Sequence, residues 1–168
     1  MKGQKAYSLA KSIHEKFYQY PNELSETAKK ELYNEYFKLV RKSAYLGHLE
    51  AQYDMAQQYE SMSFLGVQNP IYNPKKRIFW YSKACSKGHS DACNNLASIY
   101  ELGEGCEQNL DLALRLYEKS AKLGSINGKK NYEIMLRDMA KGGRYQTLLQ
   151  SLRSFLQKHS QDNGKISN

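Results

Sequence analysis

The chain alternates between stretches of helical periodicity and short breaks that contain glycine, proline or asparagine. In the first stretch, Leu9, Ile13, Phe17 and Tyr20 are spaced four, four and three residues apart, so they fall on one stripe of an α-helix. The same periodicity recurs along the chain. It predicts eight helices, over residues 5–20, 25–46, 49–60, 74–87, 91–102, 110–123, 127–141 and 144–158. The sequence is therefore expected to form an all-α protein.

Three glycines that end predicted helices divide the middle of the chain into copies. Gly47, Gly88 and Gly124 are 41 and 36 residues apart, and other residue types recur at fixed distances from them. The recurring residues are Lys42, Lys83 and Lys119 five positions before, Ala44, Cys85 and Ala121 three before, and Ala51, Ala92 and Gly128 four after. Small residues at repeated positions permit close helix packing. A period of this length, with one helix pair per copy, predicts a helical repeat array.

The copies resemble the Sel1-like repeat, a short relative of the tetratricopeptide repeat. The family pattern runs L-A-x-x-Y, E-x-G-x-G, an Asn or Asp, and then W-Y-x-K-A-A followed by Gly. The second copy matches this pattern at Leu96, Ala97, Tyr100, Glu101, Gly103, Gly105, Asn109, Tyr117, Lys119, Ala121 and Gly124. The first copy matches at Met55, Ala56, Tyr59, Glu60, Asn73, Trp80, Tyr81, Lys83, Ala84 and Gly88, and departs from the E-x-G-x-G turn over residues 61–66. The resemblance covers about residues 39–136.

This resemblance implies a short right-handed α-solenoid of antiparallel helix pairs. We expect a single Sel1-like repeat domain over residues 1–158, with N-terminal helices at 5–46. The predicted helix at 144–158 is amphipathic and suited to cap the open end of the array. Residues 159–168 are polar and are expected to be a disordered tail.

Similarity to tetratricopeptide grooves implies that a partner protein binds a concave surface lined by the first helix of each pair. The outward residues of those helices are Glu50, Tyr53, Gln57, Glu60, Asp91, Asn94, Ser98, Glu101, Lys130, Ile134 and Arg137. Charge along this line passes from acidic to basic, which favours a partner with a matching gradient. The alternative is that these residues form solvated helix faces.

A second candidate surface is a loop that occurs only in the first copy. Five additional residues there, compared with the second copy, bring large apolar side chains into the loop: Phe64, Leu65, Ile71 and Tyr72. A loop of this composition either folds back onto the array or contacts a partner.

The positive charge of the chain is concentrated at its C-terminal end. The formal net charge is +8, of which residues 125–168 contribute +5, with eight Lys and Arg against three Asp and Glu. A basic end favours acidic partners and leaves open a nucleic-acid binder that uses this end. The basic residues are scattered rather than clustered, so nucleic acid is not the expected partner.

The three cysteines are not spaced as metal ligands, because no C-x-x-C motif occurs among Cys85, Cys93 and Cys106. The spacing of Cys85 and Cys93 resembles the disulfides of the cysteine-rich Sel1-like proteins of Helicobacter-type bacteria. That resemblance implies an alternative function, the binding or hydrolysis of penicillins. The other interpretation is that both cysteines are reduced and act as small packing residues, since their equivalents in the other copies are not cysteines.

The four histidines do not form a catalytic or metal-binding cluster in the sequence. His14 and His159 are isolated, whereas His48 and His89 follow the helix-ending glycines Gly47 and Gly88. We therefore expect His48 and His89 to cap the preceding helix and interact with the dipole at its C-terminus.

No motif for catalysis, nucleotide binding or membrane insertion is found in the sequence. The chain has no G-x-S-x-G, no Walker-type loop and no G-x-G-x-x-G, so we expect neither enzymatic activity nor a cofactor, and no metal site. No apolar stretch approaches the roughly 18 residues of a membrane span, and the first residues lack an apolar signal region. We therefore expect a cytoplasmic protein, exported only if a signal segment has been removed.

Together these observations predict a non-catalytic scaffold or adaptor that binds another protein and is a monomer when unbound. The narrower hypothesis is a bacterial immunity protein that neutralises a toxin. The penicillin-binding and nucleic-acid-binding alternatives stay open at this point.

Overall fold

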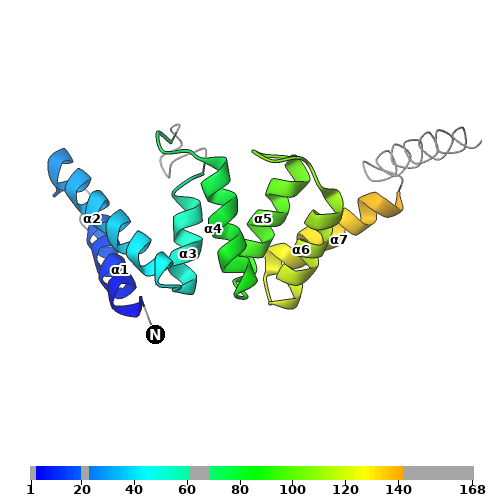
Figure 1. Ribbon diagram of the computed structural model, residues 1–168, viewed down its shortest axis with the longest axis horizontal. Coiled ribbons are helices and arrows are strands. Elements are labelled where there is room, and N and C mark those ends of the chain that lie inside the picture. The colour runs from blue at the N-terminus through cyan, green and yellow to red at the C-terminus, as the bar shows by residue number, and fades with distance from the viewer. Residues whose placement is uncertain (1–2, 20–22, 61–68, 142–168) are drawn as a thin grey trace, which may run out of the picture.

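The computed structural model describes residues 3–19, 23–60 and 69–141, and these residues form seven α-helices and no strand (Figure 1). The helices are α1 (Gln4–Gln19), α2 (Glu26–Tyr45), α3 (Leu49–Gln57), α4 (Pro74–Ser86), α5 (Ser90–Leu102), α6 (Leu110–Lys122) and α7 (Ile126–Ala140). The predicted all-α architecture is confirmed. The expected helix at 144–158, the tail at 159–168 and the loop residues Phe64 and Leu65 lie outside the described residues.

The helices begin where the sequence supplies a side chain that can cap them. Ser25, Asn73, Asn109 and Ser125 each accept a hydrogen bond from the backbone N–H three residues later. Such a bond satisfies one of the backbone donors that the first turn of a helix leaves unpaired. Pro74, directly after the Asn73 cap, has no N–H to leave unpaired.

The helix ends also follow the repeat. The predicted left-handed conformation at the repeated glycines is confirmed, with φ of 89° at Gly47 and 93° at both Gly88 and Gly124. Helix α3 is an exception, because it ends at Gln57 and not at Glu60 as expected. The side-chain amide of Asn69 donates to the carbonyls of Gln58 and Glu60, at 2.8 and 2.9 Å, and so binds the chain beyond α3 to the loop.

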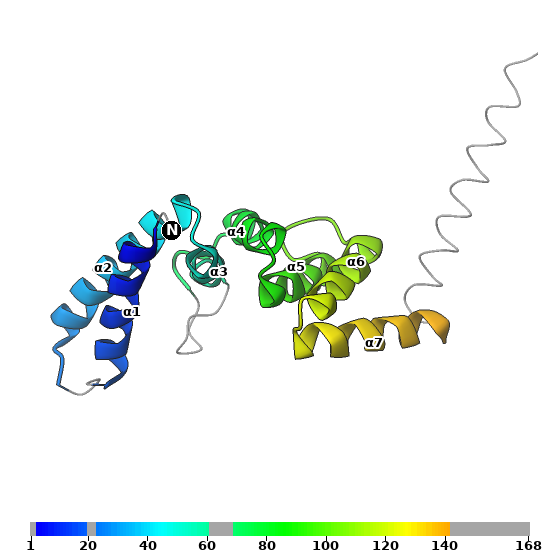
Figure 2. The same cartoon turned by 90° about the horizontal axis from the view of Figure 1, so that it is seen from below.

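Consecutive helices pack against each other, and α5 also contacts α7. Figure 2 shows α4 and α6 on one side of the array and α3, α5 and α7 on the other. We call the exposed side of α3, α5 and α7 the first-helix face, because each is the first helix of its pair. The exposed side of α2, α4 and α6 is the second-helix face.

The core consists of small side chains packed between larger aromatic and aliphatic side chains. The repeated positions Ala44, Ala51, Ala92 and Cys85 are buried, and Tyr81 and Trp80 pack in the same cluster. A second cluster joins α5, α6 and α7 through Ala97, Leu110, Ala113, Tyr117 and Met135. Small residues let the helix axes approach, and the aromatic residues fill the grooves that remain.

Leu136 departs from the expected burial. It occupies the repeat position of Tyr59 and Tyr100, but 39% of it is exposed. Within the described part of the chain α7 is the last helix, so no following helix covers this side of it.

Close backbone contact fixes the turn of the second repeat. Gly105 has φ of 77°, and a Cβ placed there would lie 2.2 Å from the Cβ of Pro74. Only glycine adopts this conformation and leaves room for the first residue of α4. The E-x-G-x-G turn of one repeat therefore packs directly on the second helix of the repeat before it.

Candidate protein-binding face

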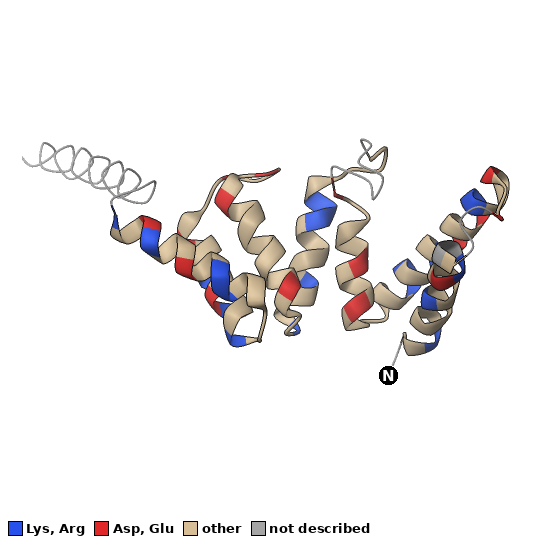
Figure 3. Ribbon diagram, turned by 180° about the vertical axis from the view of Figure 1, so that it is seen from behind, with Lys and Arg blue, Asp and Glu red and all other residues tan. Residues whose placement is uncertain are grey.

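Charge along the first-helix face changes sign, as the sequence indicated. Helix α3 carries Glu50 and Asp54 and no basic residue, and α5 carries Asp91 and Glu101 and no basic residue. Helix α7 carries three basic residues against two acidic ones, a net +1. In Figure 3, which shows the ribbon from behind, the charged positions of α3 are all coloured as acidic, while α7 has positions of both colours. The two ends of this face differ in the charge that they offer a partner.

Several of the predicted groove residues are bound to the neighbouring repeat. Glu50 Oε2 lies 3.3 Å from Nε2 of His89, and the ring of Tyr53 stacks on the His89 ring with centroids 4.2 Å apart. These contacts join α3 to the start of α5. Tyr53 also accepts a hydrogen bond from the Gln57 amide at 3.3 Å.

The next pair of repeats is joined in the same way. The Ser125 hydroxyl donates to Asp91 at 2.8 Å, and the Asn131 amide donates to the side-chain oxygen of Asn94 at 2.9 Å. Both bonds connect α5 to α7 or to its cap. Part of the predicted groove thus connects neighbouring repeats, and does not act only as a free surface.

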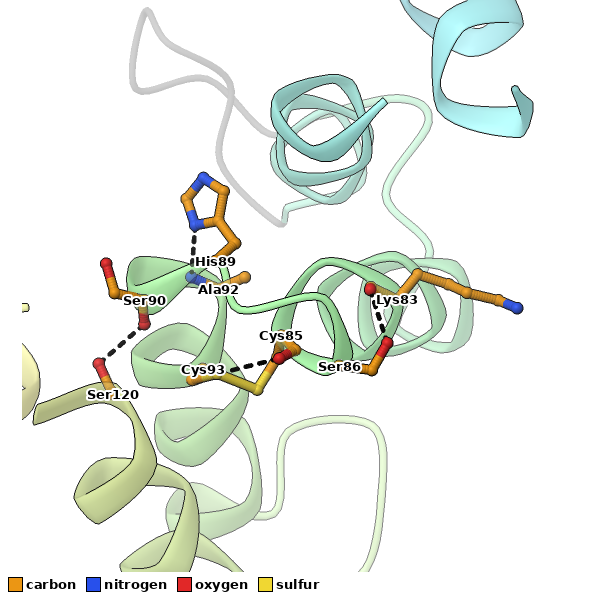
Figure 4. Close-up of a disulfide and its surroundings, with 8 residues drawn as sticks. All are labelled: Lys83, Cys85, Ser86, His89, Ser90, Ala92, Cys93 and Ser120. Carbon is orange, nitrogen blue, oxygen red and sulfur yellow. Dashed lines mark hydrogen bonds between the residues drawn. A yellow bond between two sulfur atoms is a disulfide. The ribbon is translucent and has the colours of Figure 1, made fainter. Parts of the chain in front are cut away.

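The two histidines that follow the glycines have a different role from the one predicted. His48 and His89 are N-caps of α3 and α5, and their Nδ1 atoms accept from the N–H groups of Ala51 and Ala92, at 3.4 and 3.2 Å. Figure 4 shows the bond between His89 and Ala92. The prediction that they serve the preceding helix C-terminus was wrong. A residue between two helices can reach either one, and here the free N–H groups of the following helix are the partners.

An accepting Nδ1 requires the proton to be on Nε2 of the neutral imidazole. In both histidines that Nε2–H points back to the preceding repeat, where it donates to Gln4 of α1 or to Glu50 of α3. Ser125 occupies the equivalent position and does the same, since it caps α7 and donates to Asp91 of α5. One residue per repeat therefore starts its own helix and holds the helix before it.

Glu60 and Glu101 hold tyrosines within their own repeats. Glu60 accepts a hydrogen bond from the Tyr81 hydroxyl, and Glu101 accepts from the Tyr117 hydroxyl at 2.8 Å. Burial and the nearby carboxylate raise the pKa of both tyrosines above the usual value for a phenol, so the hydroxyls stay protonated donors. These two glutamates, predicted as groove residues, thus bind the second helix of the repeat.

Glu50 and Asp91 are exposed but bonded to the next repeat, and the exposed groove residues without such a bond lie mainly on α7. Lys130, Ile134 and Arg137 are exposed, and within the described ranges neither basic residue forms an ion pair. Gln57 on α3 is also exposed, whereas Ser98 on α5 is half-buried beside Tyr117. A partner that binds Lys130 or Arg137 would therefore displace no ion pair among the described residues.

One contact on this side was not predicted. The Tyr7 hydroxyl of α1 donates to Asp54 of α3 at 2.9 Å, and burial raises the pKa of the Asp54 carboxyl. Asp54, Asn95 and Asn131 each lie seven residues after a helix-ending glycine, and each forms a side-chain hydrogen bond. A polar residue at that position in all three copies is a signal in the sequence that marks the position, although it does not identify the partner.

The structure joins Cys85 at the end of α4 to Cys93 in α5 by a disulfide, with the Cα atoms 4.7 Å apart (Figure 4). Both residues are buried, and Cys106 is a free cysteine. In the first repeat the equivalent positions are Ala44 and Gln52, and there the buried Gln52 amide donates to the Ala44 carbonyl at 3.1 Å. A hydrogen bond in one repeat thus occupies the place of the disulfide in the next.

Other candidate features lie away from the first-helix face. Ile71 and Tyr72, the described members of the loop candidate, are 38% and 41% exposed. A cavity of about 480 Å³ lies between the start of α1 and the end of α2, and no predicted groove residue lines it. The described residues contain no group of three His, Cys, Asp or Glu side chains that could hold a metal ion. None of the described helices is long and apolar enough to cross a membrane.

Comparison with known proteins identifies the repeats. The family model of the Sel1 repeat matches residues 49–89 and 90–125. A curated relative, the DAP3-binding cell death enhancer 1 of Rattus norvegicus, is 30% identical over 86 residues, which are 49% of this chain and 17% of that protein. The chain therefore spans less than a fifth of the length of this relative.

Three solved structures with similar architecture are bacterial proteins. A Sel1 repeat protein from Oxalobacter formigenes matches with a TM-score of 0.59 and 24% identity, over 78% of this chain and 87% of that one. The cysteine rich protein B of Helicobacter pylori matches with a TM-score of 0.51 and 25% identity, over 58% and 69% of the two chains. A protective antigen of uropathogenic Escherichia coli with an SLR fold matches with a TM-score of 0.58 and 26% identity, over 80% and 26%.

Proposed function

This chain carries two consecutive Sel1 repeats, and from that premise we propose that it is a non-catalytic scaffold that binds a partner protein along its first-helix face. Sel1 repeats generally mediate protein–protein interaction, and the rat relative is named for binding a protein. The observation that carries the proposal is the division of this face into a bonded acidic part on α3 and α5 and an open part on α7.

The bonded part gives the face a defined shape before a partner arrives. Glu50, Asp91 and Asn94 each contact the next repeat, so their side chains are already ordered and lose little entropy on binding. Lys130 and Arg137 are exposed and add positive charge at the other end. Such a face favours a partner that presents basic groups to α3 and α5 and acidic groups to α7.

A narrower form of the proposal is that the partner is a toxin and the chain a bacterial immunity protein that neutralises it. This form rests on analogy with other small helical adaptors, and no contact in the structure distinguishes it. It predicts a toxin gene beside the gene of this chain, together with co-purification of the two proteins. A gene neighbourhood without a toxin gene would contradict the immunity proposal and would leave the general scaffold proposal unaffected.

The general proposal is tested with the purified chain as bait in a lysate of its source cells. We expect it to retain a defined protein, and we expect Lys130→Glu combined with Arg137→Glu to weaken retention by at least about tenfold, because both side chains are exposed on α7. Arg115→Glu with Lys119→Glu changes the net charge equally on α6 and serves as the matched control. Equal loss in both variants would show that net charge, and not the first-helix face, governs binding.

The disulfide favours one alternative, because the spacing of Cys85 and Cys93 resembles that of the cysteine-rich Sel1-like proteins, and a cysteine rich protein is among the similar structures. If the chain bound penicillins, a fluorescent penicillin would show saturable binding that excess unlabelled penicillin removes. The scaffold proposal expects no such binding.

A further inference from the structure

One part of the second-helix face combines positive charge with exposed aromatic side chains. The segments 36–48 and 74–88 contain no Asp or Glu. Their basic residues are Lys38, Arg41, Lys42, Lys75, Lys76, Arg77, Lys83 and Lys87, of which Arg77 is buried and paired with Glu104. The other seven are exposed, and none of them forms an ion pair with a described residue.

The aromatic residues of this region form one contiguous group across the seam between α2 and α4. Trp80 is buried, and the rings of Tyr45 and Phe79 meet it edge to face, with centroids 5.1 and 5.0 Å away. Tyr45 is 67% exposed and Phe79 48% exposed. Leu46, next to Tyr45, is 45% exposed. Large apolar side chains are thus held on the surface at fixed positions.

Cations lie directly over the two exposed rings. The Arg41 guanidinium lies 5.8 Å from the centre of the Tyr45 ring, and the Lys83 ammonium lies 5.5 Å from the centre of the Phe79 ring. Figure 4 shows Lys83 pointing away from the disulfide and from α5. Lys87 donates to the Gly47 carbonyl at 2.7 Å and so ties the end of α4 to the end of α2. We call Arg41, Tyr45, Phe79 and Lys83 the seam patch.

The seam patch is not a consequence of the repeat. At the position of Tyr45 the following copies have Ser86 and Lys122, and at the position of Phe79 the next copy has Arg115. The residues that correspond to Arg41 are Ser82 and Glu118. In the seam between α4 and α6 the four equivalent positions are Ser82, Ser86, Arg115 and Lys119, so that seam lacks both aromatic residues. Packing of the repeats does not require this group of residues on the surface.

We propose that the seam patch binds a short acidic segment of a protein that also carries an aromatic or large aliphatic side chain. Carboxylates would pair with Arg41 and Lys83, and the apolar side chain would cover Tyr45, Phe79 and Leu46. Aromatic residues and arginine at the centre of a patch are the side chains that contribute most to protein interfaces. The site lies on the opposite layer from the first-helix face, so it serves an additional partner segment and does not depend on the proposal above.

An acidic protein segment fits the patch better than a nucleic acid does. Binding of single strands uses a row of aromatic rings with open faces, along a groove that follows the phosphates. Here the two rings pack edge to face on one buried tryptophan, and each has a cation over it. The geometry offers a compact apolar centre with cations around it.

The test uses a short fluorescein-labelled peptide of glutamates with two central phenylalanines, titrated with the full chain at low salt and followed by anisotropy. We expect saturable binding that Arg41→Glu with Lys83→Glu weakens by at least about tenfold. The variant Arg115→Glu with Lys119→Glu carries the same charge change on α6 and should bind as the unmodified chain does. Lys130→Glu with Arg137→Glu should also bind normally, which separates this site from the first-helix face.

A second variant separates aromatic contact from charge. Tyr45→Ser with Phe79→Arg introduces residues that the chain itself carries at equivalent positions, and it adds a positive charge. We expect its affinity for the peptide to fall by about tenfold, while its circular dichroism spectrum stays unchanged. Equal or tighter binding by this variant would overturn the proposal. So would the absence of saturable binding to the unmodified chain, or tighter binding of a single-stranded oligonucleotide or of anionic phospholipid vesicles than of the peptide.

Discussion

At the scale of single residues, the position directly after the helix-ending glycine links two repeats. His48, His89 and Ser125 each accept from a backbone N–H of their own helix and donate to a side chain of the preceding repeat. A serine or asparagine cap can act at any pH of interest, but a histidine cap requires a neutral ring. The stability of the first junction, which His48 forms, is therefore coupled to protonation.

The stability of the chain should fall in mildly acidic solution because of His48. Burial lowers the pKa of its imidazole, so the folded chain binds this proton less readily than the unfolded chain. The free energy of unfolding should be highest above about pH 6.5 and decrease as the pH falls through that value. His48→Asn keeps a capping side chain and removes the titration. Urea unfolding of the unmodified chain and of His48→Asn, at about pH 7 and about pH 5.5, measures the change in the free energy of unfolding. An equal decrease in the two proteins would contradict the role given to His48.

The same residues show the limit of sequence analysis at this scale. The recurrence of His48 and His89 was evident in the sequence, but the helix that each one caps was not. Both neighbouring helix ends lie within reach of a residue in the turn, and only the backbone conformation selects between them. Asp54 could not be matched with Tyr7 either, because no repeat spacing connects these two positions.

At the scale of helices, the repeat predicted most of the fold. Glycine positions and capping residues gave the bounds of α4, α5 and α6 within one or two residues, since those signals act on adjacent backbone. The end of α3 was not predicted, because a side chain from the far end of the loop, Asn69, binds the carbonyls beyond it. Contacts that close a long loop depend on tertiary structure and leave no periodic pattern in the sequence.

The Cys85–Cys93 bond should stabilise the helix pair α4 and α5. Closing a loop of this length contributes about 2–3 kcal/mol in the chain-entropy model. Cys85→Ala with Cys93→Ala should lower the free energy of unfolding by about this amount, since alanine already occupies the position of Cys85 in both other repeats. Cys106→Ala is the matched control and should leave the value nearly unchanged. Urea unfolding without reductant measures both.

The oxidation state of Cys85 and Cys93 can be measured independently of the stability of the chain. Alkylation of the native chain without reductant should modify only one thiol, that of Cys106, because the other two sulfurs are bonded to each other. Modification of all three cysteines would contradict the bond and would favour the small-residue packing role.

At the scale of the whole molecule, the array has two surfaces of different character. The first-helix face is acidic on α3 and α5 and has open basic residues on α7. The second-helix face has the aromatic and basic seam patch between α2 and α4. The charge gradient was predictable from sequence, because the register of the repeats fixes which residues point outward. The seam patch was not, because its two residues from α2 lie at least 34 positions before its two residues from α4.

Hydrogen–deuterium exchange of the chain with and without its captured partner tests the central claim most directly. Binding along the first-helix face should slow exchange in α3, α5 and α7, and Lys130→Glu with Arg137→Glu should reduce that protection at equal partner concentration. Exchange in α6, which the face does not include, should change least. Protection confined to α2, α4 and α6, with none in α3, α5 or α7, would show that the partner binds elsewhere and that the first-helix face is only the support of the array.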